Sequence, residues 1–118
     1  MNQTFKVEVH HCTSSSKAPF TEALAQFEGV SVELRDKVLK GLEKLQYRFN
    51  WGKSGFTEYI AKGVYCMRII HKNTIARVFF TMIKGKIYLL NGFVKKTQQM
   101  PKREIEKAIY HMKEVHYA

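Results

Sequence analysis

Cysteine and acidic residues are scarce in this chain, and it has no long apolar run. Two cysteines in 118 residues are too few for the disulfide framework of a small secreted protein, so we expect both to be free thiols. No apolar run approaches the roughly 20 residues of a membrane-spanning helix. Residues 1–12 alternate apolar and polar side chains where a signal peptide would be apolar. We therefore expect a soluble cytoplasmic protein whose residues 1–118 form one domain.

The shortage of acidic residues is confined to one half of the chain. Residues 1–61 carry eight Lys and Arg against seven Asp and Glu, whereas residues 62–118 carry twelve against three. Nearly all of the net charge of +10 therefore belongs to the second half. This asymmetry favours a polyanionic partner, nucleic acid before membrane, and the simpler alternative is a solvated basic surface.

The first half of the chain predicts one strand and two helices. Residues 5–10 alternate as an edge strand does. Pro19 suits the first turn of a helix that ends at Gly29. Ser31 can cap a second helix, which has leucine and valine at helical spacing.

The second half changes to strand periodicity. Three β-rich runs separated by short turns predict an antiparallel meander, at residues 64–71, 75–83 and 87–94. Residues 102–116 have the apolar spacing of a helix. The order β-α-α-β-β-β-α predicts a small α+β domain, with an antiparallel sheet and the helices packed on one of its faces.

Strand alternation predicts that two arginines face each other. Arg77 alternates with apolar residues, so it points to the open face of the sheet. A two-residue turn at 72–73 puts Arg68 directly across from it, and a second such turn puts Gly92 on its other side, with Lys96 on the same face. Facing arginines repel, so the pair favours a phosphate site. A register slip of one residue would separate them.

Four segments carry a more specific signal: YCMR at 65–68, IARVFF at 75–80, LLNGFVKKT at 89–97 and PKREIEKA at 101–108. In this order and spacing they resemble the RelE/ParE toxin superfamily, and most closely its HigB-like, phage-derived branch. The resemblance is strongest between residues 63 and 112. The two helices before it agree only in layout.

The resemblance implies a RelE-like fold and the toxin of a type II toxin–antitoxin pair. Such toxins typically enter the ribosomal A site and cut mRNA there without a metal or other cofactor. Their partners are mRNA, ribosomal RNA and an antitoxin, which is usually a helix-turn-helix DNA-binding protein. The alternatives are a ParE-like inhibitor of DNA gyrase and a nucleic-acid-binding module without catalysis.

Cleavage by the 2′-hydroxyl of RNA requires charge stabilisation at the phosphate and proton transfer. We expect Arg77 and Arg68 to stabilise the charge, and Lys95 or Lys96 to reach the scissile region. Residues expected to hold the backbone of ribosomal RNA are Lys72, Lys84, Lys86, Lys102 and Arg103. His71 is a candidate for proton transfer, although alternation places it on the face opposite Arg68. A tyrosine or histidine of the last helix, or cations alone, are the alternatives.

Potential metal ligands are few along the sequence. His10, His11 and Cys12 are adjacent, but Cys-x-x-Cys and His-x-x-x-His spacings are absent. Without further ligands, the end of a strand explains these residues better than a metal site does. The sequence therefore predicts no metal site.

Overall fold

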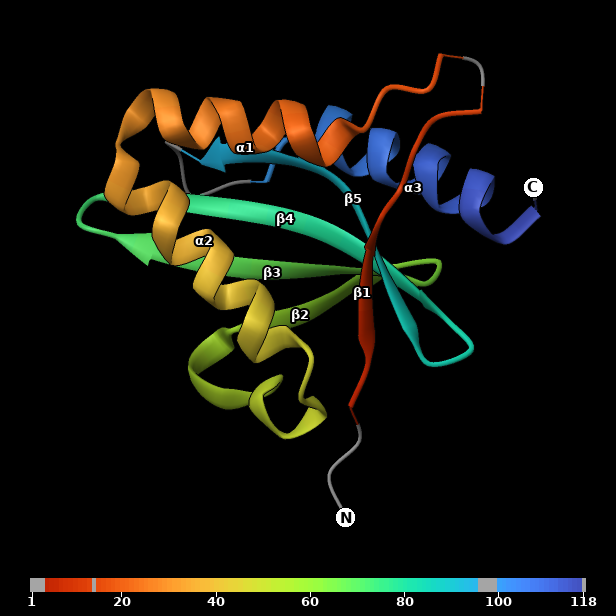
Figure 1. Cartoon of the computed structure of the whole chain (residues 1–118), viewed down its shortest axis with the longest axis horizontal. Helices are drawn as coiled ribbons and strands as arrows, with labels where there is room; N and C mark the ends of the chain where they lie inside the picture. Colours follow the sequence, from red (N-terminus) through yellow and green to blue (C-terminus); the bar gives the residue numbers. More distant parts are fainter. Residues whose placement is uncertain (1–3, 14, 96–99, 118) are drawn as a thin grey trace.

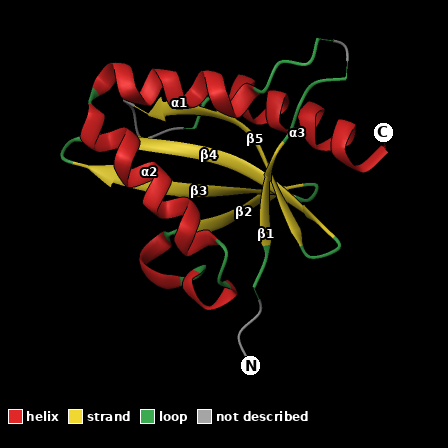
Figure 2. Cartoon of the chain, in the orientation of Figure 1, coloured by secondary structure: helices red, strands yellow, loops and turns green. Residues whose placement is uncertain are grey.

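The computed structural model describes residues 4–13, 15–95 and 100–117, and it has an α+β architecture (Figure 1, Figure 2). Its helices and strands, in chain order, are β1 (Lys6–Val9), α1 (Pro19–Val30), α2 (Val32–Leu45), β2 (Thr57–Ala61), β3 (Val64–His71), β4 (Thr74–Ile83), β5 (Lys86–Lys95) and α3 (Lys102–Tyr117). Two short 3-10 turns, Arg48–Asn50 and Lys53–Gly55, connect α2 to β2. None of the described helices is long and apolar enough to cross a membrane.

The order of elements follows the predicted one, with one additional strand. The antiparallel meander of β3, β4 and β5 is confirmed, and both N-terminal helices lie where Pro19 and Ser31 indicate. Ser31 caps α2 by accepting a hydrogen bond from the Leu34 backbone N–H at 3.0 Å. β2 is missing from the sequence-based prediction because it is short and mostly solvent-facing, so its apolar residues do not alternate clearly.

The strands form one sheet in the order β1-β5-β4-β3-β2. β1 runs parallel to β5, and all other neighbouring strands are antiparallel. β1 therefore lies at an edge, as predicted, and β2 forms the other edge. β4 lies in the centre, so its side chains have neighbours on both sides.

The helices cover both faces of the sheet, which corrects the prediction that they pack on one face. α1 and α2 lie on the near face in Figure 1 and bury one row of strand residues, which includes Val78 and Phe80. α3 lies behind the sheet and buries the alternate row, which includes Cys66, Phe79 and Leu90. Residues 78–80 are consecutive apolar residues, so both faces need a cover.

The predicted register is correct between β3 and β4 and shifts within β5. Arg68 pairs with Arg77, as expected. The pairing of β4 with β5 follows the predicted two-residue turn as far as Leu89, after which a bulge shifts it by one residue. Phe93, instead of Gly92, therefore lies across from Arg77. Gly92 faces α1 and leaves no space above the arginine.

Candidate functional site

Arg77 occupies the centre of the sheet on the face that α3 partly covers. Only 6% of the residue is exposed, because its neighbours on β3 and β5 and the α3-side core surround it. Its Nη1 donates to a carboxylate oxygen of Glu58 on β2 at 2.5 Å. Its Nε is buried and has no hydrogen-bond acceptor among the described residues. Within the described residues, the guanidinium therefore has a buried donor without an acceptor, and burying such a donor is costly unless a ligand accepts from it.

Arg68 lies across from Arg77, and its guanidinium is directed to a different partner. Its Nη2 donates to the backbone carbonyl of Ser54 at 3.1 Å. Gly55 makes room for this group, since a Cβ at that position would lie 2.5 Å from Arg68 Nη2. The two arginines therefore remain neighbours while their charges are directed to separate acceptors, which lowers the cost of the like-charge pair.

Lys95 joins the arginines on this face because of the bulge in β5. It pairs with Ile75, which is two residues before Arg77 and so points to the same side of β4. Lys95 is largely covered, with 9% of the residue exposed. Lys96, which the uninterrupted register would have placed here, lies outside the described residues. We call Arg68, Arg77, Lys95 and Glu58 the cationic site.

Cys66 lies next to Arg77, with its Sγ 4.0 Å from Arg77 Nη1. Burial raises the pKa of the Cys66 thiol to about 11, although the arginine opposes the shift. The thiol is therefore neutral at physiological pH and is unsuited to act as a nucleophile. Its contribution to the cationic site is packing.

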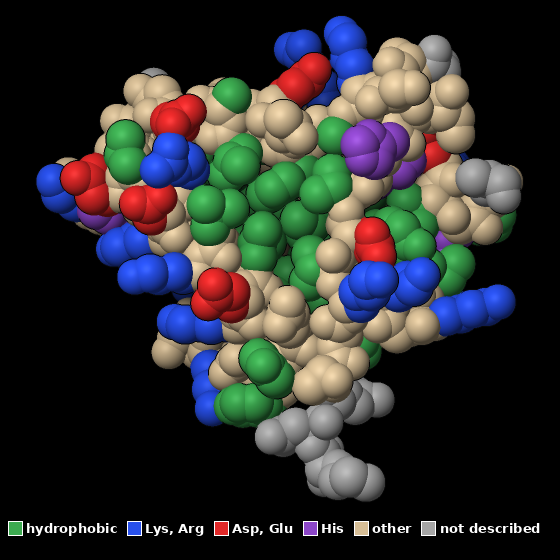
Figure 3. All heavy atoms as spheres, in the orientation of Figure 1, with side chains coloured by type: hydrophobic (Ala, Val, Ile, Leu, Met, Phe, Trp, Pro, Cys, Tyr) green, Lys and Arg blue, Asp and Glu red, His purple; other side chains and the backbone are tan. Residues whose placement is uncertain are grey.

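A basic groove of about 660 Å³ continues from Arg68 around the edge of the sheet. β2 begins at Thr57, so β3 beyond Arg68 has no neighbouring strand on that side and its residues form the floor of the groove. The walls are α2 and the two 3-10 turns. The basic residues that line the groove are Lys37, Lys40, Lys44, Lys53 and Arg68. Figure 3 shows Lys and Arg side chains along the edge of the molecule beside α2.

Helical spacing was the signal that could have revealed this groove. Lys37, Lys40 and Lys44 are three and four residues apart, and such residues share one side of a helix. The first half of the chain is almost neutral in sum. Counting charges over whole segments therefore hides a basic surface on one side of α2.

His71 does not join the cationic site. Strand alternation places it on the face of Ile69, which packs into the core beneath α1 and α2, opposite the face of Arg68. This agrees with the geometric objection raised from the sequence. The structure adds Glu58 beside Arg77, on a strand that the sequence pattern does not reveal.

The lysines and the arginine predicted to hold RNA backbone fall at two ends of the molecule. Lys72 is in the exposed turn between β3 and β4, at the same end of the sheet as Arg77. Lys102 and Arg103 are exposed in the first turn of α3. Lys84 and Lys86 flank the β4–β5 turn, and seven strand residues from Arg77 to Lys84 span roughly 23 Å. Lys84 and Lys86 therefore cannot reach the surroundings of Arg77.

Comparison with protein families gives a match. The family model described as "Phage derived protein Gp49-like" matches residues 25–113 of the chain. No curated protein matches the chain. The matched segment contains every residue of the cationic site and of the basic groove.

Proposed function

Since the chain belongs to the Gp49-like family of phage-derived proteins, we propose that it is the toxin of a type II toxin–antitoxin pair and that it cuts ribosome-bound mRNA. The family is toxin-like and of RelE type. The cognate antitoxin would be a small DNA-binding protein, often of the helix-turn-helix class in the branch that the sequence resembles. Family membership alone does not specify mRNA cleavage, and we infer that activity from the cationic site.

The observation that carries the proposal is the unsatisfied donor of Arg77 among other cations. In the cleavage step, the 2′-hydroxyl oxygen attacks the adjacent phosphorus and the bond from phosphorus to the 5′-oxygen breaks. The phosphate gains negative charge in the transition state, and fixed cations stabilise that charge without reorganising. Among the residues that the structure describes, the buried Arg77 Nε has no acceptor, and Arg77 shares its face of the sheet with Arg68 and Lys95. A non-bridging phosphate oxygen would satisfy this Nε, and would reach it only after the side chains that now bury this atom move aside.

Glu58 supplies the proton acceptor that the sequence does not identify. Its carboxylate is held at Arg77 by the ion pair, and its side chain is 51% exposed, so a substrate can reach it. A carboxylate within hydrogen-bond distance of a 2′-hydroxyl can accept its proton as the oxygen attacks. One product strand would then carry a 2′,3′-cyclic phosphate, and the other would carry a 5′-hydroxyl after its oxygen takes up a proton from water.

The basic groove supports binding of RNA backbone next to the cleaved bond. Arg68 belongs to both the cationic site and the groove, so a strand crossing Arg77 can continue past Arg68 toward Lys53 and α2. Each phosphate contact releases condensed counterions, and binding to the groove should therefore weaken steeply with salt. Backbone contacts carry no sequence information, so codon preference would depend on other residues.

Purified protein added to a reconstituted translation system tests the proposal. The wild-type chain should cut mRNA on the ribosome, and Arg77→Ala should lower the cleavage rate by about 10²–10³-fold, as expected for removing one transition-state donor. Lys113→Ala is a matched control, because it removes one exposed positive charge from α3 without touching the cationic site.

The same preparations should be tested on DNA gyrase. Inhibition of supercoiling without mRNA cleavage would replace the proposal with a ParE-like activity. RNA binding that disappears with salt and is accompanied by no cleavage would leave only a binding module. Equal cleavage by wild type and Arg77→Ala would remove the cationic site from the reaction.

A further inference from the structure

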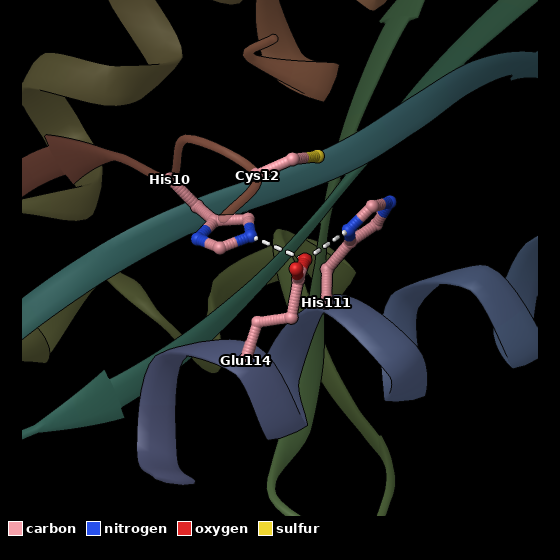
Figure 4. Close-up of side chains that lie close together, drawn as sticks. All are labelled: His10, Cys12, His111 and Glu114. Atoms are coloured by element: carbon pink, nitrogen blue, oxygen red, sulfur yellow. Dashed lines mark hydrogen bonds and ion pairs between the residues drawn. The ribbon is translucent and has the colours of Figure 1, made fainter. Parts of the chain in front are cut away.

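A second group of reactive side chains lies away from the cationic site, where the segment after β1 meets α3 (Figure 4). It consists of His10, Cys12, His111 and Glu114, and we call it the His–Cys–Glu cluster. Each residue offers one ligand atom, and these four atoms lie within 4.8 Å of one another. His111 lies within the residues that the family model matches and the other three lie outside them, and the proposed cleavage uses none of the four.

The fold holds both halves of this cluster in place. The His10 backbone N–H donates to the Leu89 carbonyl at 3.1 Å, which extends the pairing of β1 with β5 by one residue. The His10 side chain is 6% exposed. His111 and Glu114 are three residues apart on α3 and so project from the same side of the helix. Two elements packed on the same sheet therefore direct these side chains at one point.

Glu114 lies at the centre of the cluster, as Figure 4 shows. One of its carboxylate oxygens accepts from His10 Nε2 at 2.9 Å and from His111 Nδ1 at 3.2 Å. Its other oxygen accepts from the hydroxyl of Thr13 at 3.0 Å. Burial alone would raise the pKa of Glu114, but the hydrogen bonds from His10, His111 and Thr13 outweigh it and lower this pKa to about 2.

We propose that His10, Cys12, His111 and Glu114 bind one zinc ion. Two imidazoles, a thiolate and a carboxylate are all ligands that zinc accepts, and a thiolate in a set of four disfavours magnesium and calcium. The two anionic ligands would balance the charge of the ion. Four protein ligands leave no position for a catalytic water, so the site would be structural.

The distances are compatible with a tetrahedral ion. Bonds of about 2.0–2.3 Å place the ligand atoms of such a site roughly 3.3–3.8 Å apart. Ligand atoms up to 4.8 Å apart would need to approach by up to about 1.5 Å, while the pairs hydrogen-bonded at 2.9 and 3.2 Å would separate slightly. Cys12, His111 and Glu114 are partly exposed, so an ion can enter, and Thr13 already holds the outer carboxylate oxygen as an outer-shell partner does.

Bound zinc would fasten the segment after β1 to α3. These two segments are about a hundred positions apart in the chain, and Glu114 hydrogen bonds now connect them. An ion would replace those hydrogen bonds with metal–ligand bonds and would stabilise the folded state by an amount that rises with the free zinc concentration relative to its Kd. The inference is independent of mRNA cleavage and holds or fails without it.

Titration of the full chain with Co²⁺, followed by Zn²⁺, tests the proposal. Metal-free protein should take up one equivalent of Co²⁺ and show the intense visible absorption of tetrahedral cobalt with a thiolate-to-cobalt band in the near ultraviolet. One equivalent of Zn²⁺ should abolish both bands and raise the Tm, and a chelator should reverse the rise. Absence of the thiolate band, or uptake without a defined equivalent, would overturn the proposal.

Variants identify the ligands without depending on the folding of one mutant. Cys12→Ser should remove the thiolate band, and His111→Gln should weaken zinc binding by more than the roughly 10–100-fold typical of losing an outer-shell partner. His11→Gln is the matched control, since His11 is exposed and adjacent to His10 but outside the cluster. Circular dichroism of the metal-free variants establishes that each is folded. If His11→Gln and His111→Gln lost zinc binding equally, the metal would be bound by surface histidines and the proposed site would be wrong.

Discussion

Replacing Glu58 by glutamine separates two roles that this residue can have in the cationic site. Glu58 pairs with Arg77 Nη1 at 2.5 Å, and their side chains are 51% and 8% exposed. Glutamine keeps the shape and an acceptor oxygen for the guanidinium, but it cannot take up the proton of a 2′-hydroxyl. The substitution therefore preserves the hold on Arg77 and removes proton transfer.

The two effects differ enough in size to be distinguished. Removing one partner of a fully buried ion pair costs about 3–5 kcal/mol, and an exposed pair is worth about 0.2–1 kcal/mol. Glu58 is half exposed and the amide still accepts a hydrogen bond, so we expect the free energy of unfolding to fall by about 1 kcal/mol. Loss of a general base should lower the cleavage rate by about 10²–10⁴-fold. A domain of ordinary stability stays folded after losing about 1 kcal/mol of unfolding free energy. A fall in the cleavage rate therefore reports the loss of proton transfer and not unfolding.

Single-turnover cleavage of ribosome-bound mRNA and urea unfolding, carried out on the same preparations, measure the two effects. Glu106→Gln is the matched control, because it neutralises an exposed acidic residue of α3 in the same way. Glu58→Ala adds the loss of the acceptor for Arg77 and should be the least stable of the three variants. A Glu58→Gln rate equal to that of the wild type would refute the assignment of proton transfer to Glu58.

Three further predictions concern packing, RNA binding and the thiols. Gly92→Ala should lower the free energy of unfolding by about 1–3 kcal/mol, because its Cβ would lie 2.7 Å from the Arg77 carbonyl oxygen; unchanged urea unfolding would contradict this. Lys40→Ala should lower the salt dependence of RNA binding by about 0.7–0.9 in slope, measured by titration at several salt concentrations, and an unchanged slope would exclude Lys40 from the phosphate contacts. Cys12 is partly exposed, so it should react with a thiol reagent in the native protein even though burial and the nearby Glu114 raise its pKa, whereas Cys66, fully buried and with its pKa raised to about 11, should react only after unfolding. Reaction of both cysteines in the native state would show that the reagent can enter the core between the sheet and α3.

The register of the two arginines was predictable because each step depends on local pattern. Alternation along β4 identifies the side of Arg77, and a two-residue turn sets its partner as Arg68. The sequence indicates the bulge in β5 less clearly. Gly92 within a strand is the kind of residue that accompanies such a bulge, and it would have cautioned against extending the register to Lys96.

The remaining differences come from contacts that sequence pattern does not contain. Nothing local to β2 reports that Glu58 lies beside Arg77, because the strand is half exposed and its partner is 19 residues away. Consecutive apolar residues at 78–80 did indicate a sheet buried on both faces, which requires α3 on the far side. The meeting of His10 with Glu114 spans 104 residues and follows only from the packing of β1 and α3 against β5.

Cleavage of mRNA at the cationic site through attack of the 2′-hydroxyl can be tested by its products. Mapping the ends of ribosome-bound mRNA after brief exposure to the protein measures this directly. We predict new fragments with 2′,3′-cyclic phosphate and 5′-hydroxyl ends, formed by the wild type and by Lys113→Ala and reduced about 10²–10³-fold in Arg77→Ala. Intact mRNA with the wild-type protein, or the same fragments at the same rate with Arg77→Ala, would contradict it.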